Sequence, residues 1–244
     1  MNAGVPYFTT EPLVLEPADI RPERHGKIDL YVPEAAGPFP AVAFICGGPL
    51  PADVEWIDPR EWPVYRGYGT LLAAGGVVAA QMHLPLNAWA DFPRAADVFR
   101  QGIEFVRADP RVDPGRIGIW TFCGGSPLIS DWLRTPPEWL RCLAATYPAL
   151  GSRPGMDPGP RFEPAAALAG ARNVPPFVLT RVGREDPKIA HTVENFVVAA
   201  ERNQVELEII DVPNGRHGFD MLDRTEESCV AVRQALDFVI KALT

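Results

Sequence analysis

The pattern of apolar and polar positions predicts strands that alternate with amphipathic helices. Short, continuous apolar runs bounded by glycine or proline are typical of strands that are buried on both faces of a sheet. Such a run occupies residues 41–46, and residues 77–82, 141–147 and 176–182 are read as further strands. The remaining strand-like segments are residues 13–15, 27–32, 116–120 and 205–212.

Between these runs, apolar residues recur at helical spacing. The clearest helix opens at Pro93, because Ala95, Phe99, Ile103 and Val106 share one face. Further helices are predicted at residues 64–74, 127–133, 189–202 and 229–243. This alternation favours a mostly parallel sheet with helices on both faces, in which ligands bind beyond the carboxyl ends of the strands.

Length and charge narrow the function classes. The 244 residues, 47% of them hydrophobic, suit one α/β domain spanning residues 1–244, with no large cap domain. The formal net charge of −8, without a basic stripe, argues against nucleic acid and against an anionic membrane surface as partners. We expect a small-molecule acyl substrate, and the chain is compatible with a homodimer.

The N-terminal segment and the cysteines favour a cytoplasmic protein. The segment has neither a basic region nor a continuous apolar core, so it does not resemble a secretory signal. The four cysteines are far apart and form no zinc-binding or disulfide pattern. No Walker A motif or dinucleotide-binding glycine motif is visible, so we expect neither a cofactor nor a metal.

Residues 121–125, Thr-Phe-Cys-Gly-Gly, follow a predicted strand and precede a helical stretch. A nucleophile at the apex of such a tight turn forms a nucleophile elbow, which requires small residues two positions away on either side. Gly125 meets this requirement, whereas Thr121 meets it poorly. Cys123 at the apex is the candidate nucleophile, with a buried structural cysteine as the alternative. Ser126 lies beyond the turn and is expected to be a polar residue of the helix start.

Two further side chains follow later strands. Asp186 lies in the Gly-Arg-Glu-Asp segment after residues 176–182, and Glu185 beside it is the competing candidate for the carboxylate. His217 lies between glycines in the segment before the last helix. The order of nucleophile, acid and histidine is the order of the α/β-hydrolase fold, so we expect a triad of Cys123, Asp186 and His217.

An oxyanion hole requires two N–H donors. The amide of Gly124, directly after the nucleophile, should supply one. The other should come from the Cys-Gly-Gly-Pro segment after the early strand, where Gly48 is the first choice and Gly47 the second, because Pro49 has no N–H. Cys46 is read as a packed thiol.

These motifs resemble the α/β-hydrolase superfamily, and within it the dienelactone hydrolase-like group. The resemblance runs from about Lys27 to the C-terminus and rests on FICGGP, RIGIWTFCGG, GREDP and NGRHGF. It implies a Cys–Asp–His triad at Cys123, Asp186 and His217. Dienelactone hydrolases also carry a glutamate after the early strand, which FICGGP lacks.

The chain is also similar to the catalytic domain of the acyl-CoA thioesterase and bile-acid-CoA:amino-acid acyltransferase group. The acyltransferases of that group have a cysteine in an elbow whose first glycine is replaced, as Thr121 replaces it here. The segment YRGYGTLLAAGGVVAA is similar as well. We expect no counterpart of their N-terminal β-sandwich.

The expected activity is hydrolysis of an ester, lactone or thioester through an acyl-cysteine intermediate. One alternative is a cysteine-dependent acyltransferase or cyclase with an acceptor other than water. Another is a serine hydrolase in which cysteine has replaced serine at position 123. A catalytically silent receptor on the same fold is the least favoured reading.

The substrate pocket is less well marked than the triad. Candidate lining residues are aromatic or imidazole side chains near the strand ends, namely Trp56, Trp62, Tyr65, His83 and Trp89. Each of them has an equally plain interpretation as a core or loop anchor. The glycine- and proline-rich residues 148–164 follow a central strand and are expected to overhang the site and to influence specificity.

Overall fold

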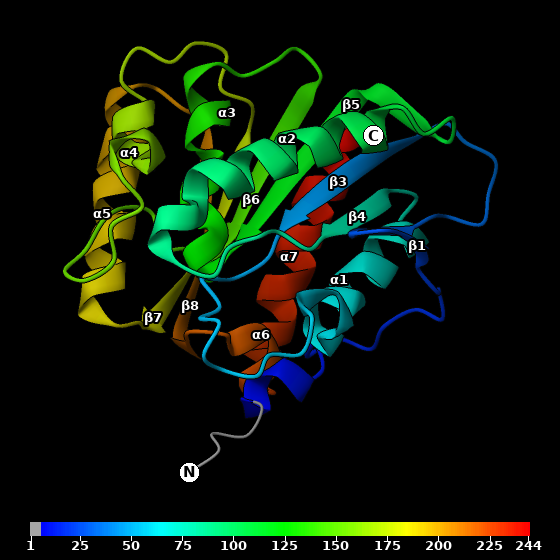
Figure 1. Ribbon diagram of the computed structural model, residues 1–244, viewed down its shortest axis with the longest axis horizontal. Helices are drawn as coiled ribbons and strands as arrows, with labels where there is room; N and C mark the ends of the chain where they lie inside the picture. The colour runs from blue at the N-terminus through cyan, green and yellow to red at the C-terminus, as the bar shows by residue number, and fades with distance from the viewer. Residues whose placement is uncertain (1–5) are drawn as a thin grey trace.

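The computed structural model describes residues 6–244, and their strands form one eight-stranded sheet in the order β1-β2-β4-β3-β5-β6-β7-β8 (Figure 1). The strands are β1 (Glu23–His25), β2 (Ile28–Tyr31), β3 (Phe39–Ile45), β4 (Val78–Met82), β5 (Val112–Phe122), β6 (Leu140–Thr146), β7 (Phe177–Arg184) and β8 (Leu207–Arg216). The strands from β4 to β8 in this order are parallel, whereas β1 and β2 add an antiparallel edge. The architecture is the expected mostly parallel sheet with helices, and no large cap domain interrupts residues 6–244.

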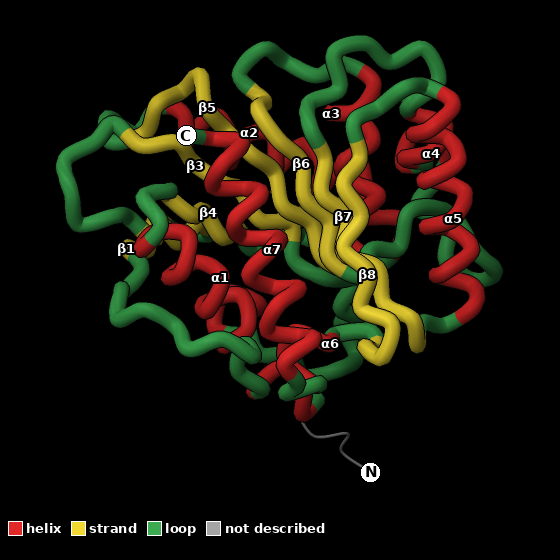
Figure 2. Tube along the Cα trace, turned by 180° about the vertical axis from the view of Figure 1, so that it is seen from behind, coloured by secondary structure: helices red, strands yellow, loops and turns green. Residues whose placement is uncertain are grey.

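Helices cover both faces of the sheet. They are α1 (Pro63–Ala74), α2 (Phe92–Arg107), α3 (Ser130–Arg134), α4 (Pro164–Ala167), α5 (Pro187–Arg202), α6 (Phe219–Leu222) and α7 (Glu226–Leu243). Short 3-10 helices are η1 (Tyr7–Thr10), η2 (Pro59–Glu61), η3 (Trp89–Asp91), η4 (Cys123–Ile129) and η5 (Pro160–Phe162). Helices α2 and α3 lie in front of the sheet in Figure 1, whereas α1 and α7 lie in front in the reverse view of Figure 2.

Most of the expected elements are present, but several bounds differ: β5 begins at Val112, β8 ends at Arg216 and α7 begins at Glu226. The segment 13–15 is not a strand; the Val14 N–H instead donates to the carbonyl of Asp220. The helical stretch predicted at 127–133 begins earlier, as the 3-10 helix η4, and continues into α3. Pro127 lies inside η4 and has no N–H to donate, which suits the irregular hydrogen bonding of this segment.

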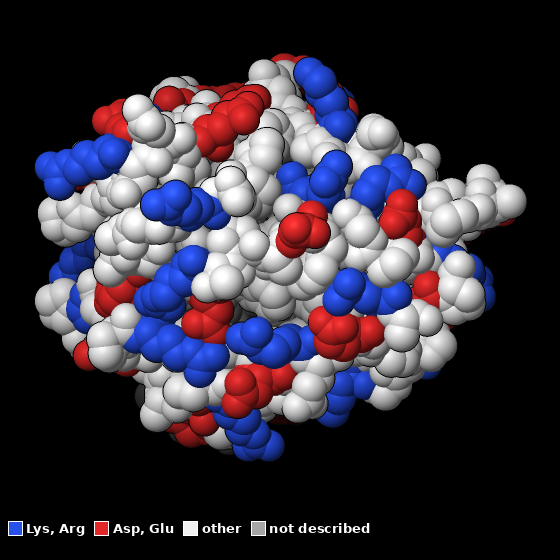
Figure 3. Space-filling view, turned by 90° about the horizontal axis from the view of Figure 1, so that it is seen from above, with Lys and Arg blue, Asp and Glu red and all other residues white. Residues whose placement is uncertain are grey.

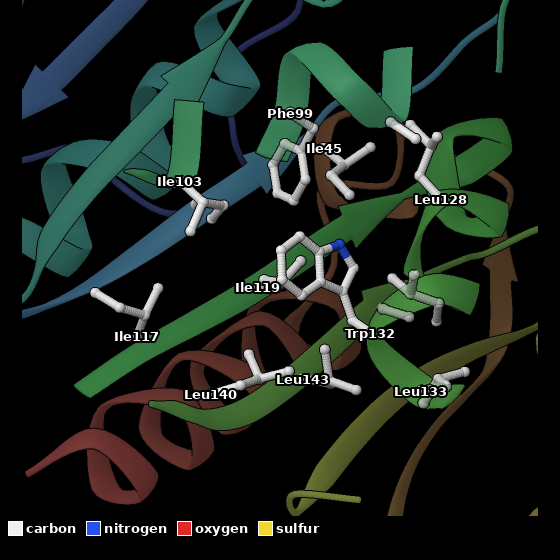
Figure 4. Packing of buried hydrophobic residues seen from close by; sticks show 14 of the residues in the cluster. Ile45, Phe99, Ile103, Ile117, Ile119, Leu128, Trp132, Leu133, Leu140 and Leu143 are labelled. Carbon is white, nitrogen blue, oxygen red and sulfur yellow. The ribbon is translucent and has the colours of Figure 1, made fainter. Parts of the chain in front are cut away.

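Two hydrophobic cores lie on the two faces of the sheet. The core beneath α2, α3 and α5 includes Ile117, Ile119 and Phe99, and the core beneath α1 and α7 includes Trp120 and Phe122 (Figure 4 shows the first). Because consecutive residues of β5 point to opposite faces, this one strand contributes to both cores. Both cores fix the position of the carboxyl end of β5, where Cys123 follows.

The surface carries mixed charge. On the face shown in Figure 3, basic and acidic residues are interspersed rather than gathered in a patch of one sign. Within residues 6–244 no helix is long and apolar enough to span a membrane.

Candidate active site

Cys123 occupies the apex of a strained turn where β5 ends and η4 begins. Its φ of +50° lies in the left-handed region, which non-glycine residues rarely adopt. A Cβ on Gly124 would lie 1.8 Å from the carbonyl oxygen of Gly48, and one on Gly125 would lie 2.2 Å from that of Cys46. The turn therefore requires glycine at both positions to pack against the segment after β3.

Thr121 stands two positions before the apex, where a small residue is expected, and its side chain makes a buried hydrogen bond. Its Oγ1 donates to Ser126 Oγ at 3.0 Å, and both side chains are fully buried. Ser126 is thus a polar residue of the helix start, as expected, and is part of the support beneath the turn.

His217 connects the elbow with a carboxylate. It directly follows β8, and its Nε2 lies 2.9 Å from Cys123 Sγ. Its Nδ1 lies 2.7 Å from Glu185 Oε2, directly after β7. Since β5, β7 and β8 are parallel strands of one sheet, their carboxyl ends bring the three side chains together.

The expected contact between Asp186 and His217 is wrong. The chain leaves β7 at Arg184 and enters α5 at Pro187, which makes Asp186 the N-cap of α5. Its Oδ1 accepts a hydrogen bond from the Lys188 N–H at 2.7 Å, the usual role of an N-cap aspartate. Glu185, the competing candidate, faces the imidazole instead, with a side chain only 6% exposed.

The electrostatics of the site favour an ion pair between Cys123 and His217. Burial alone would raise the pKa of Cys123, but the charge of His217 and its hydrogen bond to the sulfur outweigh burial and lower this pKa. Burial would lower the pKa of His217, but Cys123 and Glu185 outweigh it and raise this pKa. The arrangement favours a thiolate beside an imidazolium, which is the reactive form of a cysteine nucleophile.

The two glycines before Pro49 differ in their hydrogen bonds. The Gly47 N–H donates to Tyr65 Oη at 2.9 Å. The Gly48 N–H makes no hydrogen bond to the described residues, and the Gly48 carbonyl packs against Gly124. The first-choice donor pair of Gly48 and Gly124 therefore lies at the junction between the elbow and the segment after β3.

The first residues of the 148–164 loop contact the elbow. The Ala149 N–H donates to the carbonyl oxygen of Cys123 at 3.0 Å. Within this loop, the guanidinium of Arg153 stacks over Trp89 at 5.3 Å, and its Nη1 is buried without a hydrogen-bond partner among the described residues. Burial lowers the pKa of Arg153, and the charges that oppose burial are those of Cys123, Asp186 and Glu185. The charges of the site residues therefore act on Arg153.

The other pocket candidates have structural partners. The indole N–H groups of Trp56 and Trp62 donate to the carbonyls of Pro51 and Ile57, and the two rings stack at 6.3 Å. His83 Nδ1 lies 3.0 Å from Asp58 Oδ2. Of the five candidates, Tyr65 contacts Gly47, which lies next to Cys123, and Trp89 contacts Arg153 of the 148–164 loop.

Two residues that no motif marked also adjoin the site. Tyr147 follows β6, and its ring centroid lies 4.9 Å from that of His217. Asp220 on α6 is fully buried and accepts a hydrogen bond from Tyr147 Oη at 3.1 Å. The only sequence signal for them was position, since Tyr147 ends a predicted strand run and Asp220 lies shortly after His217.

The remaining cysteines differ from Cys123. Cys46 and Cys142 are buried, and burial raises both of their pKa values, that of Cys142 to about 12. Cys46 is thus packed, as expected, and its thiol is held in the protonated form. Among residues 6–244, no group of three histidine, cysteine or acidic side chains is arranged to hold a metal ion.

Comparisons with solved structures show the same fold. A structure of DphMB1 superposes with a TM-score of 0.76 at 20% identity, covering 97% of this chain and 90% of that one. Carboxyl esterase 2 of the mycorrhizal fungus Tuber melanosporum gives 0.72 at 18% identity, covering 98% and 92%. A bacterial heroin esterase gives 0.74 at 16% identity, covering 89% and 79%.

Comparison with curated proteins gave no match. The family model described as the dienelactone hydrolase family matches residues 79–243, which include the elbow, both carboxylates of the Glu185–Asp186 pair and His217. The chain therefore belongs to the dienelactone hydrolase family and is an α/β-hydrolase-fold enzyme.

Proposed function

We propose that the enzyme cleaves an ester, lactone or thioester through an acyl-cysteine intermediate, with Cys123 as nucleophile, His217 as acid and base, and Glu185 as the orienting carboxylate. The observation that carries this proposal is the placement of His217 between Cys123 Sγ at 2.9 Å and Glu185 Oε2 at 2.7 Å. The roles match those of a triad in which the acid fixes the tautomer of the imidazole.

In the first half-reaction, the Cys123 thiolate attacks the carbonyl carbon and a tetrahedral intermediate forms. The Gly124 and Gly48 N–H groups are the proposed donors to its oxyanion, each worth about 3 kcal/mol. The bond to the leaving oxygen or sulfur then breaks, and His217 gives its proton to the leaving group. The acyl group remains on Cys123 as a thioester.

In the second half-reaction, neutral His217 takes a proton from water, and the resulting hydroxide attacks the thioester carbonyl. Collapse of the second tetrahedral intermediate expels the Cys123 thiolate and releases the carboxylic acid. Glu185 stabilises the imidazolium that is present at the start of the first half-reaction and forms again in the second. The proton taken from the water remains on His217 and restores the ion pair.

Turnover of p-nitrophenyl acyl esters of different chain lengths tests this function. We expect steady hydrolysis by the wild type and its loss in Cys123→Ala. Cys123→Ser separates the alternatives, because a serine variant faster than the wild type would mean that cysteine has replaced the preferred nucleophile. Turnover only after addition of an amine, alcohol or thiol would indicate an acyltransferase.

The proposed partner is a small acyl substrate, and the proposed location is the cytoplasm. All four cysteines are free, and the mechanism requires Cys123 to remain reduced. Intact-protein mass spectrometry of enzyme prepared without reductant would test the thiol state.

A further inference from the structure

Tyr147 is held in an unusual conformation beside the site. Its φ of +37° lies in the left-handed region, which is a rare conformation for an aromatic residue and persists only where the surroundings enforce it. Its N–H donates to the carbonyl of Thr180 on β7 at 3.0 Å. The ring is thereby turned against the imidazole of His217, with ring centroids 4.9 Å apart and planes at 59°.

Asp220 accepts a hydrogen bond from the hydroxyl group of Tyr147. Its Oδ2 accepts hydrogen bonds from Tyr147 Oη at 3.1 Å and from Tyr68 Oη at 3.0 Å. Its Oδ1 is buried and has no hydrogen-bond partner among the described residues. A fully buried carboxylate is unfavourable for folding unless it is well paired, and the proposed reaction does not use this one.

The position of Asp220 links it to His217. The two residues lie three positions apart, His217 directly after β8 and Asp220 in α6, and α6 lies beside the end of β8 in both views (Figures 1 and 2). Burial raises the pKa of Asp220 to about 7, and the positive charge of His217 acts in the opposite direction. A second, buried carboxylate is therefore linked to the imidazole through the Tyr147 ring.

We propose that Asp220 and Tyr147 are a positioning pair for His217: Asp220 anchors the Tyr147 hydroxyl, and the Tyr147 ring holds the imidazole where it meets Glu185 and Cys123 together. The inference rests on the proposed function of the site. Neither residue touches the reacting atoms, so both act through His217.

Two tyrosines on one carboxylate oxygen provide a matched comparison. Tyr147→Phe removes the hydroxyl that links Asp220 to the ring beside His217. Tyr68→Phe removes the second hydroxyl from the same oxygen, but the Tyr68 ring packs against Trp120 and Phe122. A merely structural role of the Asp220 hydrogen bonds would make the two variants behave alike.

The first readout is kinetic. In Tyr147→Phe we expect kcat to fall about tenfold with KM nearly unchanged, because the loss of imidazole alignment affects the chemical step. Tyr68→Phe should stay within about twofold of the wild type. Asp220→Ala should resemble Tyr147→Phe, and Asp220→Asn, which keeps an acceptor oxygen, should restore most of the loss.

The second readout is the titration of the Cys123 thiolate, followed by its rate of alkylation against pH. A loosened His217 stabilises the thiolate less, so Tyr147→Phe should raise the apparent pKa of Cys123 by at least about half a unit, and Tyr68→Phe should leave it unchanged. The variants leave unchanged the other titratable groups that act on Cys123. These are Glu185 after β7, Tyr65 on α1 and Arg153 in the 148–164 loop.

Equal effects of Tyr147→Phe and Tyr68→Phe on both readouts would overturn the inference. The titration needs no turnover, so it tests the positioning pair even if Cys123 proves not to be acylated. A failed acylation with a shifted titration would contradict the proposed function alone. If Tyr147→Phe does not fold, the comparison of Asp220→Asn with Asp220→Ala tests the same link.

Discussion

Glu185 Oε2 lies 2.7 Å from His217 Nδ1, in the position where a carboxylate can fix the tautomer of the imidazole. Cys123 Sγ lies 2.9 Å from the opposite nitrogen, Nε2, and the charge of His217 lowers the pKa of Cys123 against the effect of burial. The neighbouring Asp186 carboxylate serves the backbone of α5 instead.

Substitutions of Glu185 and Asp186 should therefore have different effects, one on activity and the other on stability. Glu185→Gln should lower kcat by about 10²- to 10⁴-fold, because the imidazole loses both its orientation and its counter-charge. Asp186→Ala should leave kcat within about threefold but reduce the free energy of unfolding by about 1 kcal/mol, because α5 loses its N-cap. Steady-state kinetics and urea denaturation of both variants check this. A greater kinetic loss in Asp186→Ala would assign the acid to Asp186.

The pH dependence of Cys123 reactivity follows from its lowered pKa. An ordinary cysteine loses its proton near pH 8.5, so thiolate should persist at lower pH in this enzyme and alkylation by iodoacetamide should remain fast there. In His217→Asn, burial is no longer opposed by the imidazolium, and the thiolate should form only above the ordinary range. Ultraviolet absorbance of the thiolate, followed against pH, gives the titration of Cys123 in the wild type and in His217→Asn. Coincident curves for the two proteins would refute the ion pair.

The left-handed backbone at Cys123 predicts an unusual stability order. Cys123→Gly should be about 1 kcal/mol more stable than Cys123→Ala, because only glycine adopts a positive φ without a steric cost. Ser130, whose φ of −54° is helical, is the control, since there alanine should be the more stable replacement. Chemical denaturation of the four variants gives the comparison. Alanine favoured at both positions would mean that the turn at Cys123 is relaxed.

Arg153 should influence which acyl groups are accepted. Its guanidinium stacks over Trp89, has no counter-charge at hydrogen-bonding distance among the described residues, and is acted on by the charges of Cys123 and Glu185. Arg153→Gln should raise KM about tenfold for an ester whose acyl group ends in a carboxylate, and should leave the neutral ester of equal length nearly unchanged. Kinetics on the two matched esters decide this, and equal changes for both would contradict a charge-specific role.

Much of the site followed from sequence because its signals are local. The elbow, the histidine between glycines and the apolar strand runs each consist of adjacent residues, so Cys123, His217 and the mostly parallel sheet were recognisable. The segment of β2 was expected as a strand, but β1 and its antiparallel pairing with β2 were not. Both strands are short and carry no continuous apolar run.

The carboxylate could not be assigned in the same way. Glu185 and Asp186 are adjacent, and which of them faces His217 depends on where β7 ends and α5 begins. That boundary also decides which residue caps the helix, and aspartate is the better N-cap. Tyr147 and Asp220 could not be predicted for a similar reason. Their hydrogen bond joins two segments that are distant in the sequence, and neither segment carries a motif that indicates it.

The most direct test of the account is rapid-quench intact-protein mass spectrometry with p-nitrophenyl acetate, followed by peptide mapping. The account predicts one acetyl group that appears with the burst of p-nitrophenol, maps to Cys123 and is absent from Cys123→Ala. The acetylated enzyme should then decay at the rate of steady turnover. Hydrolysis of the ester without an adduct on Cys123, or with the acetyl group on another residue, would contradict the central claim.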